Sequence, residues 1–196
     1  MHARILMTAI LIVPLMTCKR NDDTTERKAS AKATPLTEQL LSQTPDDRLE
    51  ALVMDHLNAR TEADSYERSH EIVSAMSKGF QMMYATWLLE AEVNNGGFHQ
   101  FFWNHSGLFA KEALEGLKLV GADEHAKLVG KSIAVYESEK PKMDNARRHD
   151  TLEAFGESAR ESKFDELDSA FYALKEDLSA LRIRYIRAHP RDFVSP

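Results

Sequence analysis

Apolar residues recur at steps of three and four along most of the chain from residue 45 onward, which is the spacing of a helix with one buried face. The run over residues 80–93 has apolar side chains on so broad a face that we expect a central helix packed on several sides. Further helices are predicted over residues 45–60, around 72–76, and over 108–120, 124–139, 165–174 and 175–188. No stretch alternates as a strand would, so the pattern predicts an all-α domain of about six to eight helices.

Capping residues and helix breakers indicate where these helices begin and end. Thr44 and Pro45 are expected to cap and open the first helix of the domain. Asn94-Asn95-Gly96-Gly97 is expected to end the central helix, because Asn and Gly tolerate the left-handed backbone of a C-terminal cap. A single helical turn is predicted over residues 98–104. Pro141 is expected to end the helix predicted over residues 124–139. Residues 61–69 are predicted to form a loop, and residues 142–162 are only weakly apolar.

The N-terminus has the features of an export signal. Residues 5–16 are apolar but too few to span a bilayer, which needs about 20 residues, so they are typical of a signal peptide. Leu15-Met16-Thr17-Cys18 resembles a bacterial lipobox, in which Cys18 is lipidated and becomes the new N-terminus. The alternatives are a plain secretory signal and an uncleaved anchor. We therefore predict a signal peptide over residues 1–17, a flexible tether over 18–44 with a short helix around 37–42, and a helical domain over 45–196.

The charge and cysteine content narrow the classes of function. The chain has 25 basic and 31 acidic residues, a net charge of −6, so we expect no direct binding to nucleic acid. Cys18 is the only cysteine, which excludes an intrachain disulfide and a cysteine-based zinc site. No metal site or cofactor is predicted. The predicted location is the cell envelope, as a lipoprotein for which the outer membrane is one destination, and the alternatives are a secreted or a cytoplasmic protein.

Residues 92–107 have the most unusual composition in the chain, with two adjacent glycines, three phenylalanines and a tryptophan. This stretch resembles the hallmark of a bacterial family of all-helical domains of unknown function whose named representative is DNA-mimic protein 19. The hallmark positions are Glu92, Asn95, Gly96, Gly97, Phe98, Gln100, Phe101, Phe102 and Asn104. Weaker similarity extends the resemblance to about residues 45–194. It implies an all-helical fold; the acidic, DNA-like surface of the representative is not a property of the hallmark.

Two interpretations of the hallmark remain open. In the first it is a structural corner, where Phe98, Phe101 and Phe102 anchor the core while Gln100, Asn95 and Asn104 satisfy backbone groups freed at helix ends. In the second it is a pocket for a planar polar ligand, lined by Trp103, Phe102, Gln100 and Asn104 with Glu92 beside it. No nucleophile–base pair is evident, so no catalytic residue is predicted. His99 and His105 are six residues apart, which does not place them on one helical face, and we expect surface or capping histidines.

Acidic residues are frequent near the C-terminus. Glu153, Glu157 and Glu161 are spaced by four, so in a helix they would line one face about 6 Å apart. With Asp165 and Asp168 they form a candidate acidic interaction face, although a solvated helix surface is the simpler explanation. The last helix carries Arg182, Arg184, Arg187 and Arg191, which would pair with the acids, face anionic lipid or lie in solvent.

These observations favour a non-enzymatic interaction module of a lipid-anchored envelope protein, with an unknown protein partner and a homodimer as a further option. The alternative is a DNA-mimic regulator that binds a transcription factor through the acidic face, which requires a cytosolic location. A third hypothesis is an enzyme or ligand binder at the corner formed by residues 92–104.

Overall fold

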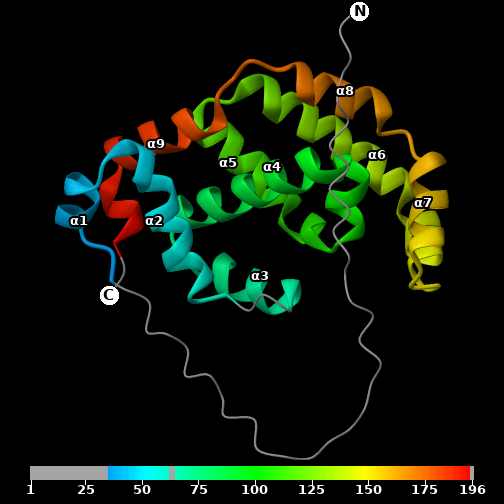
Figure 1. Cartoon of the computed structure of the whole chain (residues 1–196), viewed down its shortest axis with the longest axis horizontal. Coiled ribbons are helices and arrows are strands. Elements are labelled where there is room, and N and C mark those ends of the chain that lie inside the picture. The colour runs from blue at the N-terminus through cyan, green and yellow to red at the C-terminus, as the bar shows by residue number, and fades with distance from the viewer. Residues whose placement is uncertain (1–34, 62–64, 195–196) are drawn as a thin grey trace, which may run out of the picture.

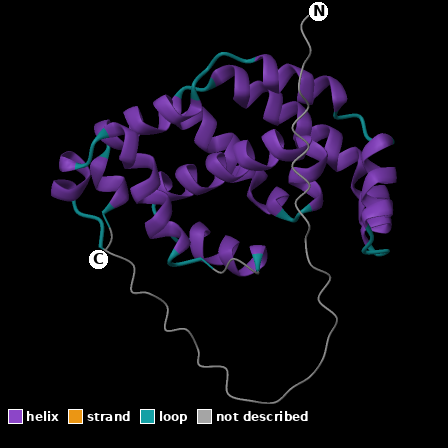
Figure 2. Ribbon diagram, viewed as in Figure 1, coloured by secondary structure: helices purple, strands orange, loops and turns teal. Residues whose placement is uncertain are grey.

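In the computed structural model, which describes residues 35–61 and 65–194, every regular element is a helix (Figure 2). The elements in chain order are α1 (Glu38–Gln43), α2 (Asp46–Asn58), α3 (Tyr66–Ser74), α4 (Lys78–Trp103), η1 (Ser106–Phe109), α5 (Ala110–Val120), α6 (Asp123–Arg147), α7 (Leu152–Arg160), α8 (Asp165–Ala173), α9 (Leu178–Ala188) and η2 (Pro190–Phe193). The all-α prediction is confirmed, with nine α-helices in these ranges against the six to eight expected. The predicted signal peptide and Cys18 lie outside the described residues.

Helix α4 runs through the middle of the molecule, and α2, α3, α5 and α8 lie against it (Figure 1). It begins after Ser77, whose hydroxyl accepts a hydrogen bond from the Phe80 N–H. Its buried side chains, among them Phe80, Met83 and Leu89, face several neighbouring helices. The predicted central helix is therefore confirmed, because its broad apolar stripe is covered on several sides.

The folded part of the chain begins before residue 45. Leu36 and Leu41 are buried, and α1 lies against α9 and η2 at one end of the molecule (Figure 1). The short helix expected around residues 37–42 is confirmed, but residues 35–44 pack against the domain and are not part of a free tether. Thr44 does not cap the next helix as predicted, since its N–H and hydroxyl both donate to the Leu40 carbonyl and so end α1.

Two helices extend farther than the sequence indicated. Helix α3 begins at Tyr66 within the predicted loop, because the Ser65 hydroxyl caps it by accepting from the Arg68 N–H at 3.1 Å. Helix α6 continues through Pro141, so the expected stop is wrong. A proline inside a helix costs about 3 kcal/mol. The next turn compensates by burying Met143, which is only 2% exposed, and such burial is worth about 1.5–3 kcal/mol.

The arginines of α9 do not pair with the acidic stretch over residues 150–177. Arg182 is buried and binds Glu50 at 2.6 Å and Glu90 at 2.7 Å, which joins α9 to α2 and α4. Arg187 binds Asp46 and also donates to the carbonyls that end α1. Both residues therefore hold helices together within the fold. None of the described helices is long and apolar enough to cross a membrane.

Candidate functional site

The hallmark stretch contains a break inside α4. Gly96 and Gly97 leave the helical conformation, with φ and ψ of −163° and 28° at Gly96 and of 76° and −179° at Gly97. The angles at Gly97 are accessible almost only to glycine. A Cβ atom there would also lie 2.3 Å from the Oδ2 atom of Asp168. The predicted end of the central helix is thus confirmed, but the chain resumes a helix that extends to Trp103, longer than the single turn expected.

Helix α8 supplies partners for the backbone groups that this break exposes. The Phe98 N–H donates to Oδ1 of Asp168 at 2.8 Å, and the Tyr172 hydroxyl donates to the Val93 carbonyl at 2.7 Å. One bond therefore caps the new helix start and the other caps the old helix end. Burial raises the pKa of Asp168, although the bond from Phe98 opposes that rise. Asp168 was predicted to belong to an acidic interaction face, but it is turned toward α4.

Glu92 is the centre of a polar network that spans the break. Its Oε2 atom accepts hydrogen bonds from Gln100 Nε2 at 2.8 Å and Asn104 Nδ2 at 3.1 Å. Its Oε1 atom accepts a bond from the Tyr66 hydroxyl at 3.3 Å, which attaches α3. Burial, followed by the charge of Glu92, raises the pKa of Tyr66 to about 12. Gln100 and Asn104 thus bind a carboxylate and not freed backbone groups as predicted, and Asn95 is exposed.

The three hallmark phenylalanines are buried, as predicted for a structural corner: Phe98 and Phe101 are 0% exposed and Phe102 is 1% exposed. Phe102 stacks on Tyr136 of α6 with ring centres 4.2 Å apart, and Phe98 meets Phe171 of α8 edge-on at 5.6 Å. The aromatic side chains therefore join α4 to α6 and α8.

His99 is buried, which corrects the expectation of a surface or capping histidine. Its ring stacks on Trp103 and meets Phe155 edge-on, and its Nε2 atom is 3.0 Å from the Ser158 hydroxyl of α7. Burial and the positive charge of Arg147 lower the pKa of His99 to about 4. Among the described residues no group orients its Nδ1 atom as the third member of a catalytic triad would. The His99–Ser158 pair therefore fastens α7 to α4 and is a poor base for catalysis.

A hollow of about 360 Å³ lies beside the end of α4, near the predicted ligand pocket. It is lined by Glu67, Phe102, His105, Tyr136, Lys140 and Arg147, among others. Of the predicted pocket residues it shares Phe102. The basic side chains already have partners: His105 Nδ1 lies 3.3 Å from Glu67, and both Lys140 and Arg147 bind Asp144. Within the described ranges, no three His, Cys, Asp or Glu side chains come together to hold a metal ion.

The five acids of the predicted interaction face are placed in different settings. Glu153 and Glu157 lie on α7, where both are exposed. Glu161 follows α7 and binds Lys142 of α6 at 2.6 Å, and this bond lowers the pKa of Glu161. Asp165 is exposed at the first position of α8, whereas Asp168 caps the α4 break. The structure therefore leaves Glu153 and Glu157 together on one exposed helix and gives Glu161 and Asp168 internal partners.

Helix α7 is the only helix of the described residues that has no buried residue. It lies at the end of the molecule opposite α1 and contacts α6 and α4 (Figure 1). Its first residue, Leu152, is 91% exposed. No pattern along the chain indicates this exposure, because an isolated leucine in a weakly apolar stretch has no predictable neighbours.

The comparisons with known proteins agree with the hallmark. The model of a family described as DMP19-like protein matches residues 74–189, which include the whole of α4 and all elements up to the end of α9. The match leaves out α1, α2, η2 and all of α3 except Ser74. No curated protein and no solved structure matches the chain.

Proposed function

The chain belongs to the DMP19-like protein family, and on that premise we propose that it is a non-enzymatic interaction module that binds a protein partner through α7. We further propose that a lipid on Cys18 holds it at the cell envelope. The partner would present an apolar socket bordered by lysine or arginine side chains. This chemistry is complementary to the side chains that α7 exposes.

The hallmark supports this proposal by what its side chains already do. The carboxylate of Glu92 accepts bonds from three side chains, and the glycine break is capped by α8. These groups are engaged in building the frame, which leaves little capacity for a substrate. The hypothesis of an enzyme or ligand binder at residues 92–104 therefore has less support than a surface function.

The single observation that carries the proposal is the surface of α7. Leu152 is 91% exposed, and the exposed carboxylates of Glu153 and Glu157 form no hydrogen bond or ion pair with any described residue. The opposite side of the helix is fixed, because Phe155 packs on His99 and Ser158 binds it. Covering a leucine side chain is worth about 1.5–3 kcal/mol, so a partner that buries Leu152 would gain affinity. The two carboxylates would then direct the basic border of that partner.

A site-specific photo-crosslinker tests the surface. We expect a crosslinker at position 152 of the full chain, in cells, to capture a partner that the same group at Lys131, exposed on α6, does not capture. The crosslinked peptide of the partner should contain lysine or arginine. With that partner purified, Leu152→Asp should weaken binding about tenfold or more, and Lys131→Glu should not. Equal capture from both positions, or unchanged binding by Leu152→Asp, would refute the proposed surface.

A separate experiment tests the anchor. The chain should incorporate a palmitate analogue in growing cells and sediment with membranes, whereas Cys18→Ser should lose both properties. Incorporation that survives Cys18→Ser would show that the lipid is elsewhere. Because the label does not depend on α7, the anchor and the interaction surface are tested independently.

One observation supports the DNA-mimic alternative: the carboxylates of Glu153 and Glu157, which have no partner among the described residues, lie one turn apart on α7. It requires a cytosolic pool of the chain and a partner that binds DNA. Operator DNA would then displace the chain from that partner, and Glu153→Lys with Glu157→Lys would abolish the competition. A partner found only in the envelope, with binding unaffected by DNA, would favour the interaction module.

A further inference from the structure

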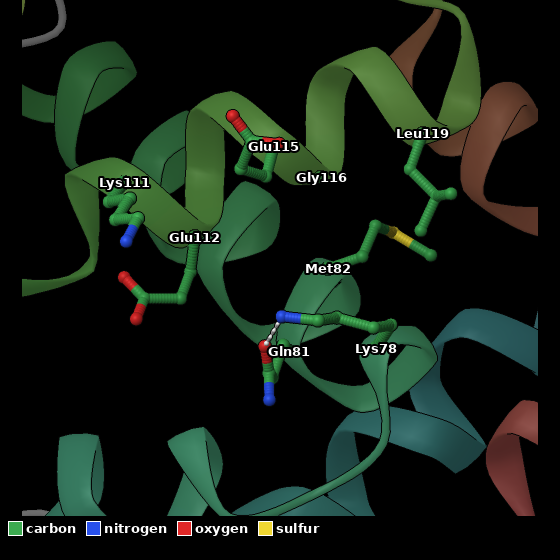
Figure 3. A pocket seen from close by; sticks show the side chains of 8 residues that line it. All are labelled: Lys78, Gln81, Met82, Lys111, Glu112, Glu115, Gly116 and Leu119. Carbon is green, nitrogen blue, oxygen red and sulfur yellow. Dashed lines mark hydrogen bonds between the residues drawn. The ribbon is translucent and has the colours of Figure 1, made fainter.

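A hollow of about 230 Å³ lies between the first turns of α4 and helix α5, away from the hallmark and from α7 (Figure 3). Its wall combines apolar and charged side chains, which include Lys78, Met82, Lys111, Glu112, Gly116 and Leu119. The volume is below the range of about 300–1,000 Å³ typical of pockets for drug-sized ligands. It therefore suits a molecule about as large as a free amino acid.

The two helices touch at Gly116, which fixes the floor of the hollow. A Cβ atom at Gly116 would lie 2.9 Å from Thr86 Cγ2 and 3.0 Å from the Met82 Cα, so the backbones approach closely there. Beside this contact, the side chains of Met82 and Leu119 extend toward each other and form the apolar part of the wall (Figure 3). Leu119 is 43% exposed, and an apolar group of a ligand would cover it.

Glu112 provides the negative part of the wall. Its side chain is only 17% exposed, and its Oε1 atom is 3.2 Å from His70 Nε2. Its Oε2 atom is enclosed and has no hydrogen-bond partner among the described residues. An unsatisfied buried group of this kind costs about 1–3 kcal/mol. The last torsion of a glutamate is broad, so a small rotation would turn Oε2 toward the hollow. A ligand amine there would supply the missing donor.

Two lysines provide the positive part. The Lys78 ammonium reaches into the space beneath α5 and donates to Oε1 of Gln81 at 2.9 Å (Figure 3). Lys111 stands next to Glu112 on α5. Neither lysine forms an ion pair with any acid of the described ranges. Glu115, the other acid of the wall, is bound to Lys118 at 3.1 Å. The two ammonium groups are therefore available to a ligand carboxylate.

Charges of both signs on one small wall select the class of ligand. A simple anion would be repelled by Glu112, and a simple cation would be repelled by Lys78 and Lys111. A zwitterion satisfies both signs at once. We propose that this hollow binds a small zwitterion with an apolar side chain, of the free amino acid type. Its amine contacts Glu112, its carboxylate contacts Lys78 and Lys111, and its side chain covers Leu119 beside the buried Met82. This proposal does not depend on the partner that α7 binds.

Calorimetric titration of the full chain, purified in mild detergent, tests the ligand class. L-Leucine is the first probe, and L-methionine and L-phenylalanine vary the side chain. L-Leucinamide lacks the carboxylate and 4-methylpentanoate lacks the amine, so each should bind about tenfold more weakly than leucine or worse. No binding by any of the three amino acids would overturn the proposal. Equal binding of leucine and either analogue would overturn it as well.

Variants and a local probe test the position. Glu112→Gln and Lys78→Met should each weaken leucine binding about tenfold. Lys127→Met, on the exposed surface of α6, is the matched control and should bind as the unmodified chain does. Thermal unfolding checks that each variant is folded. Leucine should also shift the NMR signal of the Met82 methyl group, and this measurement needs no substitution. An unshifted methyl signal, or normal binding by folded Glu112→Gln, would place the ligand elsewhere.

Discussion

The α4 break and helix α7 both attracted attention in the sequence, yet they use their polar groups in opposite ways. At the break, the Glu92 carboxylate accepts three side-chain bonds, and Asp168 and Tyr172 of α8 cap the backbone. On α7, Leu152 projects into solvent and Glu153 has no partner among the described residues. An unusual composition therefore does not by itself indicate a binding site. What separates the two regions is whether their polar and apolar groups are satisfied within the fold.

The first prediction addresses the most constrained position of the break. Gly97→Ala should lower the free energy of unfolding by about 3 kcal/mol or more, because alanine strains at φ 76° and its Cβ would meet Asp168. Gly130→Ala is the matched control: it lies inside α6 with open space around it, so it should be neutral or stabilising by up to about 1 kcal/mol. Denaturant unfolding measures both. If the two variants lose equal stability, the backbone at the break is not rigid.

The second prediction concerns His99, which links the break to α7. Its pKa of about 4 in the folded chain lies below the ordinary value of 6.5, so between these pH values the unfolded chain binds a proton that the folded chain does not. The stability contribution is complete above pH 6.5 and falls as pH drops toward 4, by up to roughly 3 kcal/mol.

Unfolding measured at a series of pH values checks this expectation. Between pH 4 and 6.5, His99→Gln should lower the number of protons taken up on unfolding by about one. His149→Gln, at an exposed position, should leave that number unchanged. An identical pH profile for His99→Gln and the unmodified chain would contradict the buried, neutral histidine.

The sequence predicted those parts of the fold that depend on residues close together along the chain. Helix α5 ends at Val120, where the predicted helix over residues 108–120 also ends, and its buried Ala113 and Leu117 have the spacing of one helical face. The prediction that α6 ends at Pro141 was wrong, because burial of Met143 and contacts to other helices offset the free-energy cost of a proline inside a helix. The glycine break was predicted for a local reason, because glycine easily adopts the backbone that such a break needs, and the structure has Gly121 in a similar role with φ 77° at the end of α5.

The partners of the hallmark depend on contacts that no local pattern carries. Asp168, which accepts a hydrogen bond from the Phe98 N–H, is 70 residues away from it in the chain. Tyr66, which donates a hydrogen bond to Glu92, is 26 residues away from it and lay in a predicted loop. The spacing of the acidic residues predicted that Asp168 would lie on a solvent-exposed face, but tertiary packing turns its side chain toward α4. A structural corner was therefore one of the two interpretations that the sequence allowed for the hallmark, whereas the helices that close it could not be predicted.

The third prediction separates the two caps that α8 supplies. Asp168→Ala should cost about 1–2 kcal/mol by removing the acceptor for the Phe98 N–H. Tyr172→Phe removes only the donor to the Val93 carbonyl and should cost about 1 kcal/mol. Gly97→Ala combined with Asp168→Ala should be less destabilising than the sum of the two changes, because the contact with the new Cβ is relieved. Strict additivity in denaturant unfolding would show that Asp168 does not face Gly97.

The last prediction tests whether α7 has a free outer side. Leu152→Asp should change the free energy of unfolding by no more than about 0.5 kcal/mol, because the side chain already lies in solvent. Phe155→Ala on the same helix should cost about 1–3 kcal/mol, because its ring packs on His99 and Trp103. The effects on partner binding should have the reverse order. Leu152→Asp should lose binding, whereas the fraction of Phe155→Ala that stays folded should retain it. If instead Leu152→Asp destabilises the chain as much as Phe155→Ala does, Leu152 is packed in solution, and α7 resembles the α4 break in having no free surface to offer.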